Sequence, residues 1–142
     1  MNRTELPDVN VLLALLQPGH VAHEIAGQWF CAVEKFATTP VTELGLLRLS
    51  LNPKVMGQQV APAAALASLS SVRADSRAIF LPDDGTLDDP LISDRGLQGH
   101  RQVTDFHLVN LAARHGMLLV TLDQALSEAL LPGDRIHVRT LG

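Results

Sequence analysis

The chain has 142 residues, of which 46% are hydrophobic and 18% are charged, and its formal net charge is −4. This composition excludes a disordered chain, and the length predicts one globular domain over residues 1–142. Apolar runs fall short of the roughly 18–20 residues that cross a bilayer, and the first residues do not resemble a secretory signal. We therefore expect a cytoplasmic protein with no membrane partner, and its only cysteine, Cys31, excludes an internal disulfide.

Short apolar runs alternate with helical stretches, which is typical of an α/β domain with a mainly parallel central sheet. The first half of the chain predicts a strand at 4–8, helices at 9–16 and 20–35, and a brief strand at 38–40. This strand leads into a helix that ends at Asn52-Pro53, and another helix follows at 60–73. The second half predicts strands at 78–81 and 117–121, helices at 104–115 and 124–131, and an edge strand at 135–139. Residues 82–100 form a long loop, and such loops are usually functional or mobile.

Four acidic residues lie at the boundaries of these elements. Asp8 and Asp123 each end a predicted strand, whereas Glu43 and Asp105 each lie in the first turn of a predicted helix. Ligands of open α/β sheets bind outside the carboxyl ends of the strands, so Asp8, Glu43 and Asp123 should share one edge. Asp105 joins them if its helix starts at that edge.

Carboxylates gathered in one cleft repel one another, and some would take up protons unless a positive charge compensates them. A hard divalent cation such as Mg²⁺ or Mn²⁺ prefers carboxylate and water oxygens and would remove this conflict. Such a cation can lower the pKa of a bound water and neutralise charge on a phosphoryl group. The pattern therefore favours a metal-dependent phosphodiesterase.

Each acid also has a purely local interpretation. Asp8 and Asp123 could cap the helices that follow them, and Glu43 and Asp105 could complement helix dipoles. These local roles explain single residues, but not why four elements carry an acid at one edge. The spacing by itself leaves both interpretations open.

Four segments in order carry a resemblance to a known family. They are LPDVNVLLAL at 6–15, TPVTELGLLRL at 39–49, GHRQVTD at 99–105 with its continuation through Leu111-Ala112, and LVTLD at 119–123. Together they resemble PIN-domain ribonucleases, and more narrowly the VapC toxins of bacterial type II toxin–antitoxin systems, over nearly the whole chain. The resemblance implies a PIN-like, Rossmann-like fold with three α/β/α layers.

The resemblance also implies that Asp8, Glu43, Asp105 and Asp123 form the catalytic acidic quartet that holds Mg²⁺ or Mn²⁺. In this interpretation Asp8 and Asp123 are direct ligands, whereas Glu43 and Asp105 bind through water or orient the nucleophile.

Polar neighbours of the quartet have expected roles as well. We expect Asn10 and Thr121 to support the metal ligands through hydrogen bonds, with a turn as the alternative role for Asn10. Arg48 and Arg101 are candidates for RNA contacts, and the alternative for Arg101 is an ion pair with an aspartate of the long loop.

By resemblance, the chain is a toxin that cleaves structured RNA, either tRNA or ribosomal RNA, and thereby inhibits translation. The implied partners are a cognate VapB-type antitoxin, the RNA substrate and a second copy of the chain in a homodimer. Two alternatives stay open. The chain could be a PIN-fold binding module without catalysis, or a metal-dependent nuclease that processes RNA outside a toxin–antitoxin pair.

Overall fold

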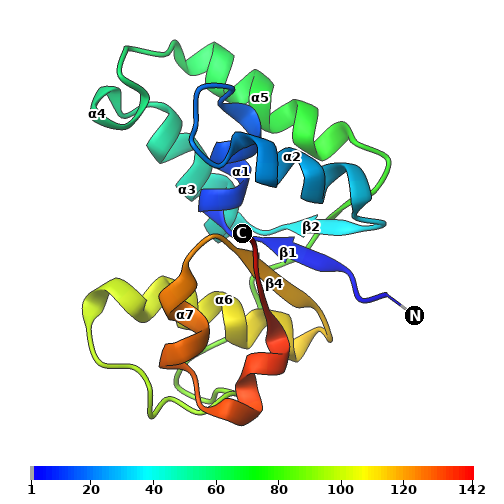
Figure 1. Ribbon diagram of the computed structural model, residues 1–142, viewed down its shortest axis with the longest axis vertical. Coiled ribbons are helices and arrows are strands. Elements are labelled where there is room, and N and C mark those ends of the chain that lie inside the picture. The colour runs from blue at the N-terminus through cyan, green and yellow to red at the C-terminus, as the bar shows by residue number, and fades with distance from the viewer. Residues whose placement is uncertain (1) are drawn as a thin grey trace.

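In the computed structural model, which describes residues 2–142, five parallel strands form one sheet in the order β3-β2-β1-β4-β5 (Figure 1). The expected α/β class with a mainly parallel sheet is therefore confirmed. Because the strands share one direction, the carboxyl ends of β1, β2 and β4 meet at one edge of the sheet. The strands are β1 (Glu5–Pro7), β2 (Phe36–Thr38), β3 (Ala78–Phe80), β4 (Leu118–Thr121) and β5 (Val138–Thr140).

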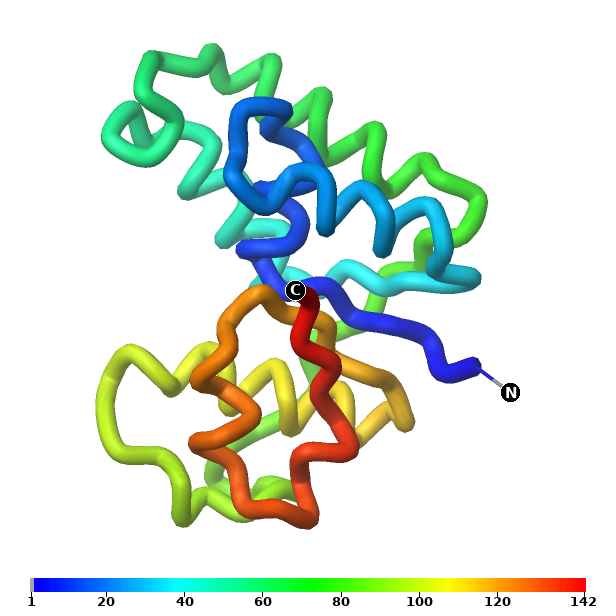
Figure 2. The backbone as a smooth tube through the Cα atoms, in the orientation of Figure 1, coloured from blue at the N-terminus to red at the C-terminus, as the bar shows by residue number. Residues whose placement is uncertain are grey.

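Helices cover both faces of the sheet and give the three expected layers (Figure 1). On one side lie α1 (Val9–Leu16), α2 (His23–Ala32), α3 (Pro40–Ser50), α4 (Pro53–Met56) and α5 (Pro62–Ala74). On the other side lie α6 (Val103–Arg114), α7 (Gln124–Ala129) and the 3-10 helices η1 (His100–Gln102) and η2 (Pro132–His137). The tube in Figure 2 follows this division, with blue to green helices on one side and yellow to red helices on the other. None of the helices within residues 2–142 has the length and apolar character needed to cross a membrane.

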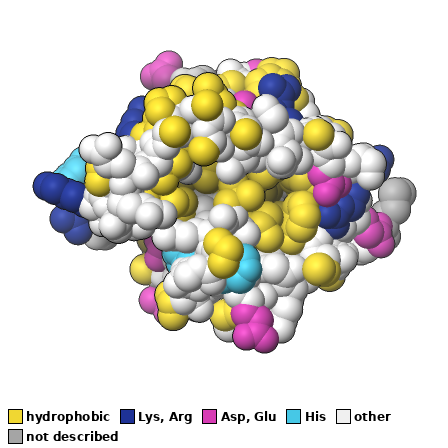
Figure 3. Space-filling view, turned by 90° about the horizontal axis from the view of Figure 1, so that it is seen from above, with side chains coloured by type: hydrophobic (Ala, Val, Ile, Leu, Met, Phe, Trp, Pro, Cys, Tyr) yellow, Lys and Arg dark blue, Asp and Glu magenta, His cyan; other side chains and the backbone are white. Residues whose placement is uncertain are grey.

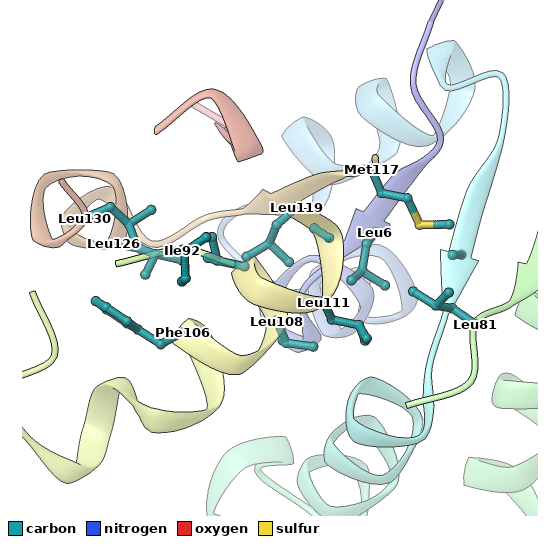
Figure 4. Close-up of a cluster of buried hydrophobic side chains, with 13 residues drawn as sticks. Leu6, Leu81, Ile92, Phe106, Leu108, Leu111, Met117, Leu119, Leu126 and Leu130 are labelled. Carbon is teal, nitrogen blue, oxygen red and sulfur yellow. The ribbon is translucent and has the colours of Figure 1, made fainter. Parts of the chain in front are cut away.

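The alternation of strand side chains divides the core into two hydrophobic clusters. Leu6 of β1 and Leu119 of β4 pack in one cluster with residues of α6 and α7, as Figure 4 shows. Phe36 of β2 and Val120 of β4 point into the other cluster, with residues of α1, α2 and α3. Successive strand residues face opposite sides of a sheet, so β2 and β4 each pack against both helical layers.

Several predicted boundaries are wrong. The strand predicted at 38–40 is β2, two residues earlier, because Phe36 and Ala37 fill the two core clusters while Pro40 already begins α3. The helix predicted at 20–35 is shorter, because the chain becomes extended at Val33 before it enters β2. The strand predicted at 135–139 is mostly η2, and only Val138–Thr140 pairs with β4 at the sheet edge. Helix α4 was not predicted.

The long loop is irregular over residues 82–99, here called the strap, and it is fixed by side chains of the layer that it crosses. Asn110 of α6 accepts a hydrogen bond from the Leu91 backbone at 2.8 Å, and Asp134 accepts one from the Ser93 backbone at 2.8 Å. At Gly96 an added Cβ would overlap the carbonyl oxygen of Ala129 in α7. The strap therefore links α6 and α7 across one face of the molecule.

Candidate active site

Asp8 directly follows β1, and Asp123 lies two residues beyond the end of the neighbouring strand β4. The backbone N–H of Asp8 donates to the Val120 carbonyl at 2.8 Å, which joins the two strand ends. Oδ1 of Asp8 accepts from the Val9 N–H at 2.7 Å, and Oδ1 of Asp123 accepts from the Ala125 N–H at 2.9 Å. Both aspartates therefore cap helices, and both also lie at the same sheet edge. Helix capping and a position at the shared sheet edge are therefore both true of these two aspartates.

The hydroxyl of Thr121, at the end of β4, connects the two aspartates. It donates to Oδ2 of Asp8 at 3.1 Å and accepts from the backbone N–H of Asp123 at 3.1 Å. It also accepts from the amide of Asn10 at 3.2 Å, and Oδ1 of Asn10 in turn accepts from the Leu122 N–H at 3.1 Å. Thr121 and Asn10 thus hold the end of β4 against the start of α1, and the carboxylate of Asp8 is fixed at both oxygens.

Asp105 lies in the first turn of α6 and interacts electrostatically with both of these aspartates. The pKa of Asp105 is raised to about 6. Burial is the largest cause, followed by the charge of Asp8 and then by the charge of Asp123. The pKa of Asp8, which is only 6% exposed, is also raised, mainly because burial disfavours its charged form. Within residues 2–142, Asp105 has no ion pair or hydrogen bond through its side chain. The structure therefore brings three aspartates from three elements together without a cationic partner.

Glu43 lies at the same sheet edge but in a different environment. Its Oε2 accepts from the Thr38 hydroxyl at 2.7 Å and lies 3.5 Å from Nε of Arg73, and its side chain is 12% exposed. Glu43 is not among the groups that raise the pKa of Asp8 or Asp105. The three aspartates thus form one group, and Glu43 forms a second one with Thr38 and Arg73.

The sequence interpretation missed Thr38 and Arg73. Thr38 ends β2, so a correct boundary for this strand would have placed its hydroxyl at the edge. No sequence signal connects Arg73 with Glu43, because their contact depends on the packing of α5 against α3. The two expected RNA contacts, Arg48 and Arg101, are both exposed. Neither forms an ion pair within the described part of the chain, so Arg101 does not pair with the aspartates of the strap.

The chemistry of these donors suits a hard divalent cation, because every candidate ligand is a carboxylate oxygen and two of the carboxyl groups resist ionisation. In this conformation, no three acidic, histidine or cysteine side chains among residues 2–142 are close enough to hold one ion. To hold one ion, the carboxylates would have to come closer together through small rotations of their side chains, because the strands fix the backbone at this edge. The arrangement supplies concentrated negative charge, partly dehydrated, with a raised aspartate pKa. These are properties of sites for acid–base and metal-assisted hydrolysis.

No family model matches this chain. Individual proteins are nevertheless similar to it over most of its length. Ribonuclease VapC39 of Mycobacterium tuberculosis is 44% identical over 133 residues, which cover 92% of this chain and 96% of the relative. Ribonuclease VapC38 of the same organism is 44% identical, covering 83% and 84%, and ribonuclease VapC29 is 41% identical, covering 92% of each.

Two solved structures have a similar fold. Mycobacterium tuberculosis VapC20, described as a sarcin–ricin loop cleaving toxin, has a TM-score of 0.62 at 14% identity and covers 90% of this chain and 97% of its own. PAE2754 of Pyrobaculum aerophilum has a TM-score of 0.60 at 28% identity and covers 90% of this chain and 80% of its own. The PIN-like fold and the resemblance found in the four sequence segments are thereby confirmed. With three relatives above 40% identity along most of their length, the chain belongs to the VapC ribonuclease family.

Proposed function

We propose that this chain is the toxin of a type II toxin–antitoxin pair and acts as an endoribonuclease that hydrolyses structured RNA, tRNA or ribosomal RNA. Its membership of the VapC family supports this function. The observation that carries the assignment of the site is the group of Asp8, Asp105 and Asp123, which come from three elements and have no cationic partner. An uncompensated group of this kind lowers the stability of the fold, so a functional role explains its presence.

We further propose that the reaction depends on Mg²⁺ or Mn²⁺. Asp8 and Asp123 would be the ligands, because both flank the fixed ends of neighbouring strands. When bound, the cation would supply Lewis-acid stabilisation of the charge that develops on the phosphodiester. Asp105 would help to hold the cation or orient the attacking water. Glu43 would act from the neighbouring strand end, where Thr38 and Arg73 fix its carboxylate.

The direct test measures cleavage of total tRNA and ribosomal RNA with Mg²⁺ or Mn²⁺. We expect cleavage to stop with a chelator and to fall more than about 100-fold in Asp8→Ala and Asp123→Ala. Asp88→Ala, which removes an exposed carboxylate of the strap, is the matched control and should retain activity. Wild-type rates in both site variants would show that the site is assigned wrongly.

The target can be identified by inducing the toxin and mapping new RNA 5′ ends across the transcriptome. A few strong cleavage positions in tRNA or ribosomal RNA, absent from the Asp8→Ala strain, are expected. Growth arrest without any new 5′ ends would favour the binding module without catalysis. Cleavage restricted to maturation sites of precursor RNA would favour a processing nuclease.

For the antitoxin, we propose docking at an apolar hollow between α1, α4 and α5. Figure 3 looks onto these helices and shows hydrophobic side chains gathered around a depression. A cavity of about 80 Å³ there is lined by Leu13, Leu16, Met56, Val60 and Ala64. Ala64→Arg should prevent co-purification with the antitoxin, whereas Ala67→Arg, also exposed on α5, should not. Equal co-purification of both variants would place the antitoxin elsewhere.

We also propose a homodimer formed through α3 and α4. Leu44, Leu51 and Val55 are 58%, 41% and 39% exposed, so three apolar side chains on or next to α3 and α4 are open to solvent. Light scattering coupled to gel filtration should give twice the mass of 15.3 kDa. Leu44→Arg should give a monomer, whereas Val21→Arg, at a fully exposed position on another surface, should leave the dimer intact. A monomeric wild type would contradict this proposal.

A further inference from the structure

A stacked arginine–phenylalanine pair lies directly beside Glu43 at the carboxyl edge of the sheet. The guanidinium of Arg73, in the last turn of α5, lies 5.0 Å from the centre of the Phe80 ring. Phe80 is the last residue of the edge strand β3. Since Nε of Arg73 also lies 3.5 Å from Oε2 of Glu43, the pair is physically connected to a residue of the proposed site.

Both members of this pair are open to solvent. The side chain of Arg73 is 51% exposed, and Phe80 is 46% exposed. Together with Thr38 and Ile79 they line a shallow cavity of about 150 Å³. An aromatic ring and a guanidinium are therefore held at a fixed place on the surface, next to the cleavage site, without being used to fill the core.

The other arginine in the described chain that lies over phenylalanine rings, Arg77, shows what a purely structural contact looks like. Arg77 lies 4.3 Å from the centre of the Phe30 ring, and its nitrogens donate to Asp75 and to the carbonyls of Phe30 and Val33. The side-chain nitrogens of Arg77 are therefore occupied by hydrogen bonds within the protein. Arg73 uses only Nε within residues 2–142, so both of its terminal NH₂ groups are left for a ligand.

We propose that Arg73 and Phe80 form a nucleotide subsite for single-stranded RNA beside the cleavage site, an inference that rests on the proposed ribonuclease function. The terminal NH₂ groups of Arg73 donate to phosphate oxygens next to the scissile bond, in the paired geometry that guanidinium and phosphate favour. An unpaired base stacks on the exposed surface of the Arg73–Phe80 pair, since RNA-binding proteins stack bases on aromatic rings and guanidinium planes alike.

The charge distribution gives this subsite a clear role. The chain has a net charge of −4, and three aspartates at the sheet edge repel a polyanion. Arg73 provides positive charge at that edge, and Glu43 and Phe80 orient it there. The subsite therefore draws the RNA backbone toward the acids, and it selects a nucleotide that is already unpaired, such as one in a loop.

The test measures binding and cleavage separately. Binding of a fluorescently labelled single-stranded RNA is measured by anisotropy in chelator, where cleavage stops, and kcat and KM are measured with Mn²⁺. We expect Arg73→Ala and Phe80→Leu each to weaken binding by about 5- to 100-fold, with the change in KM exceeding that in kcat. Arg73→Lys, which keeps the charge but loses the planar fork, should fall between Arg73→Ala and wild type.

Arg114→Ala is the matched control. Arg114 is 50% exposed, lies in the last turn of α6 and pairs with Asp84 at 3.4 Å, so it equals Arg73 in exposure and charge but lies away from the site. Its RNA affinity should stay within about twofold of wild type. Circular dichroism and the thermal midpoint check the folding of every variant, and Phe80→Leu leaves the contact with Glu43 intact.

The outcomes separate the subsite from the ribonuclease function. Wild-type cleavage with unchanged KM and affinity in Arg73→Ala and Phe80→Leu would overturn the subsite alone. RNA binding that depends on Arg73 and Phe80, in a wild type that never cleaves, would support the subsite and contradict the ribonuclease. Equal weakening by Arg114→Ala would reduce the effect to net charge and would also overturn the subsite.

Discussion

Helix α6 borders two regions that hold aspartates in opposite electrostatic states. At its first turn, burial and the charges of Asp8 and Asp123 raise the pKa of Asp105 to about 6. Near its end, His115 lies 2.7 Å from Oδ1 of Asp84 in the strap, and this hydrogen bond lowers the pKa of Asp84. The first region gathers acids without a cationic partner, whereas in the second region Asp83 pairs with His107, and Asp84 pairs with His115 and Arg114.

The difference distinguishes acids that stabilise the fold from acids that destabilise it. A carboxyl whose pKa is lowered on folding adds stability above its unfolded pKa, and this contribution is lost as the pH falls through the folded value. A carboxyl whose pKa is raised has the opposite effect, because its ionised form is disfavoured in the folded state. The pairing of Asp84 in the strap therefore contributes to folding, whereas Asp8 and Asp105 are retained at a cost in stability.

The largest expected effect comes from Asp105→Asn. Cleavage should fall by about 100-fold or more. The metal-free variant should nevertheless be more stable than wild type at pH 7.5, by about 1 kcal/mol once solvent screening of a partly exposed group is allowed for. The gain should disappear below the ordinary aspartate pKa of 3.8, where Asp105 is protonated in both folded and unfolded wild type. Thermal midpoints between pH 3.5 and 8 test this, and a variant less stable than wild type at pH 7.5 would contradict it.

Thr121→Val tests whether the aspartates depend on the hydroxyl that joins them. The change removes the donor to Asp8 and the acceptor for the Asp123 N–H. We expect Mn²⁺ affinity to fall by about 10- to 100-fold, measured by calorimetry or by the thermal shift that Mn²⁺ produces. Thr140→Val, at the paired position on β5, is the control. A similar loss in both variants would show that the Thr121 hydroxyl has no specific role.

Gly96→Ala tests the strap without touching a charge. The new Cβ would overlap the Ala129 carbonyl, so the strap or α7 must shift. We expect a loss of roughly 1–3 kcal/mol in the free energy of unfolding, measured by urea denaturation. Gly99→Ala meets no atom within 4 Å and should be neutral. If the strap serves only the fold, cleavage per folded molecule should stay unchanged, whereas a loss of kcat would give it a role in catalysis.

The smallest expected effect comes from Asp84→Asn, which removes an exposed paired acid. Stability at pH 7 should fall slightly. The difference from wild type should shrink as the pH drops below 3.8, where Asp84 of the unfolded chain takes up a proton, and should vanish below the lowered pKa of folded Asp84. At pH 7 the Asp84→Asn change lowers stability, whereas the Asp105→Asn change raises it. Thermal midpoints of both variants over one pH series therefore test the comparison directly. If the thermal midpoints of the two variants changed with pH in the same way, the two regions would not differ in how their aspartates affect stability.

The sequence predicted the parts of this arrangement that local patterns determine. The end of β1 and the end of β4 are marked by an apolar run followed by an aspartate, and Asp105 lies in the first turn of the helix that comes after the long loop. Parallel strands then bring these residues to one edge. The surroundings of Glu43 were not predictable, because Arg73 reaches it through the packing of two helices.

The predicted element boundaries were wrong where strand pairing and burial, rather than the local sequence pattern, determine the structure. The alternating tail at 135–139 resembles a strand, yet only three residues reach the position beside β4 where backbone hydrogen bonds form. The prediction for β2 gave weight to Thr39 and Pro40, but the core selects Phe36 and Ala37. Burial of side chains by distant segments decides such cases, and a single sequence does not display it.

The hydrogen bond between Thr121 and Asp8 has a consequence for protein synthesis. It joins residues 113 positions apart in the chain, and β4, which carries Thr121 and pairs with β1, is made late in the chain. A chain still growing on the ribosome has Asp8 but lacks the strand that delivers Asp123. The three aspartates of the site can therefore come together only after at least 123 of the 142 residues have been made.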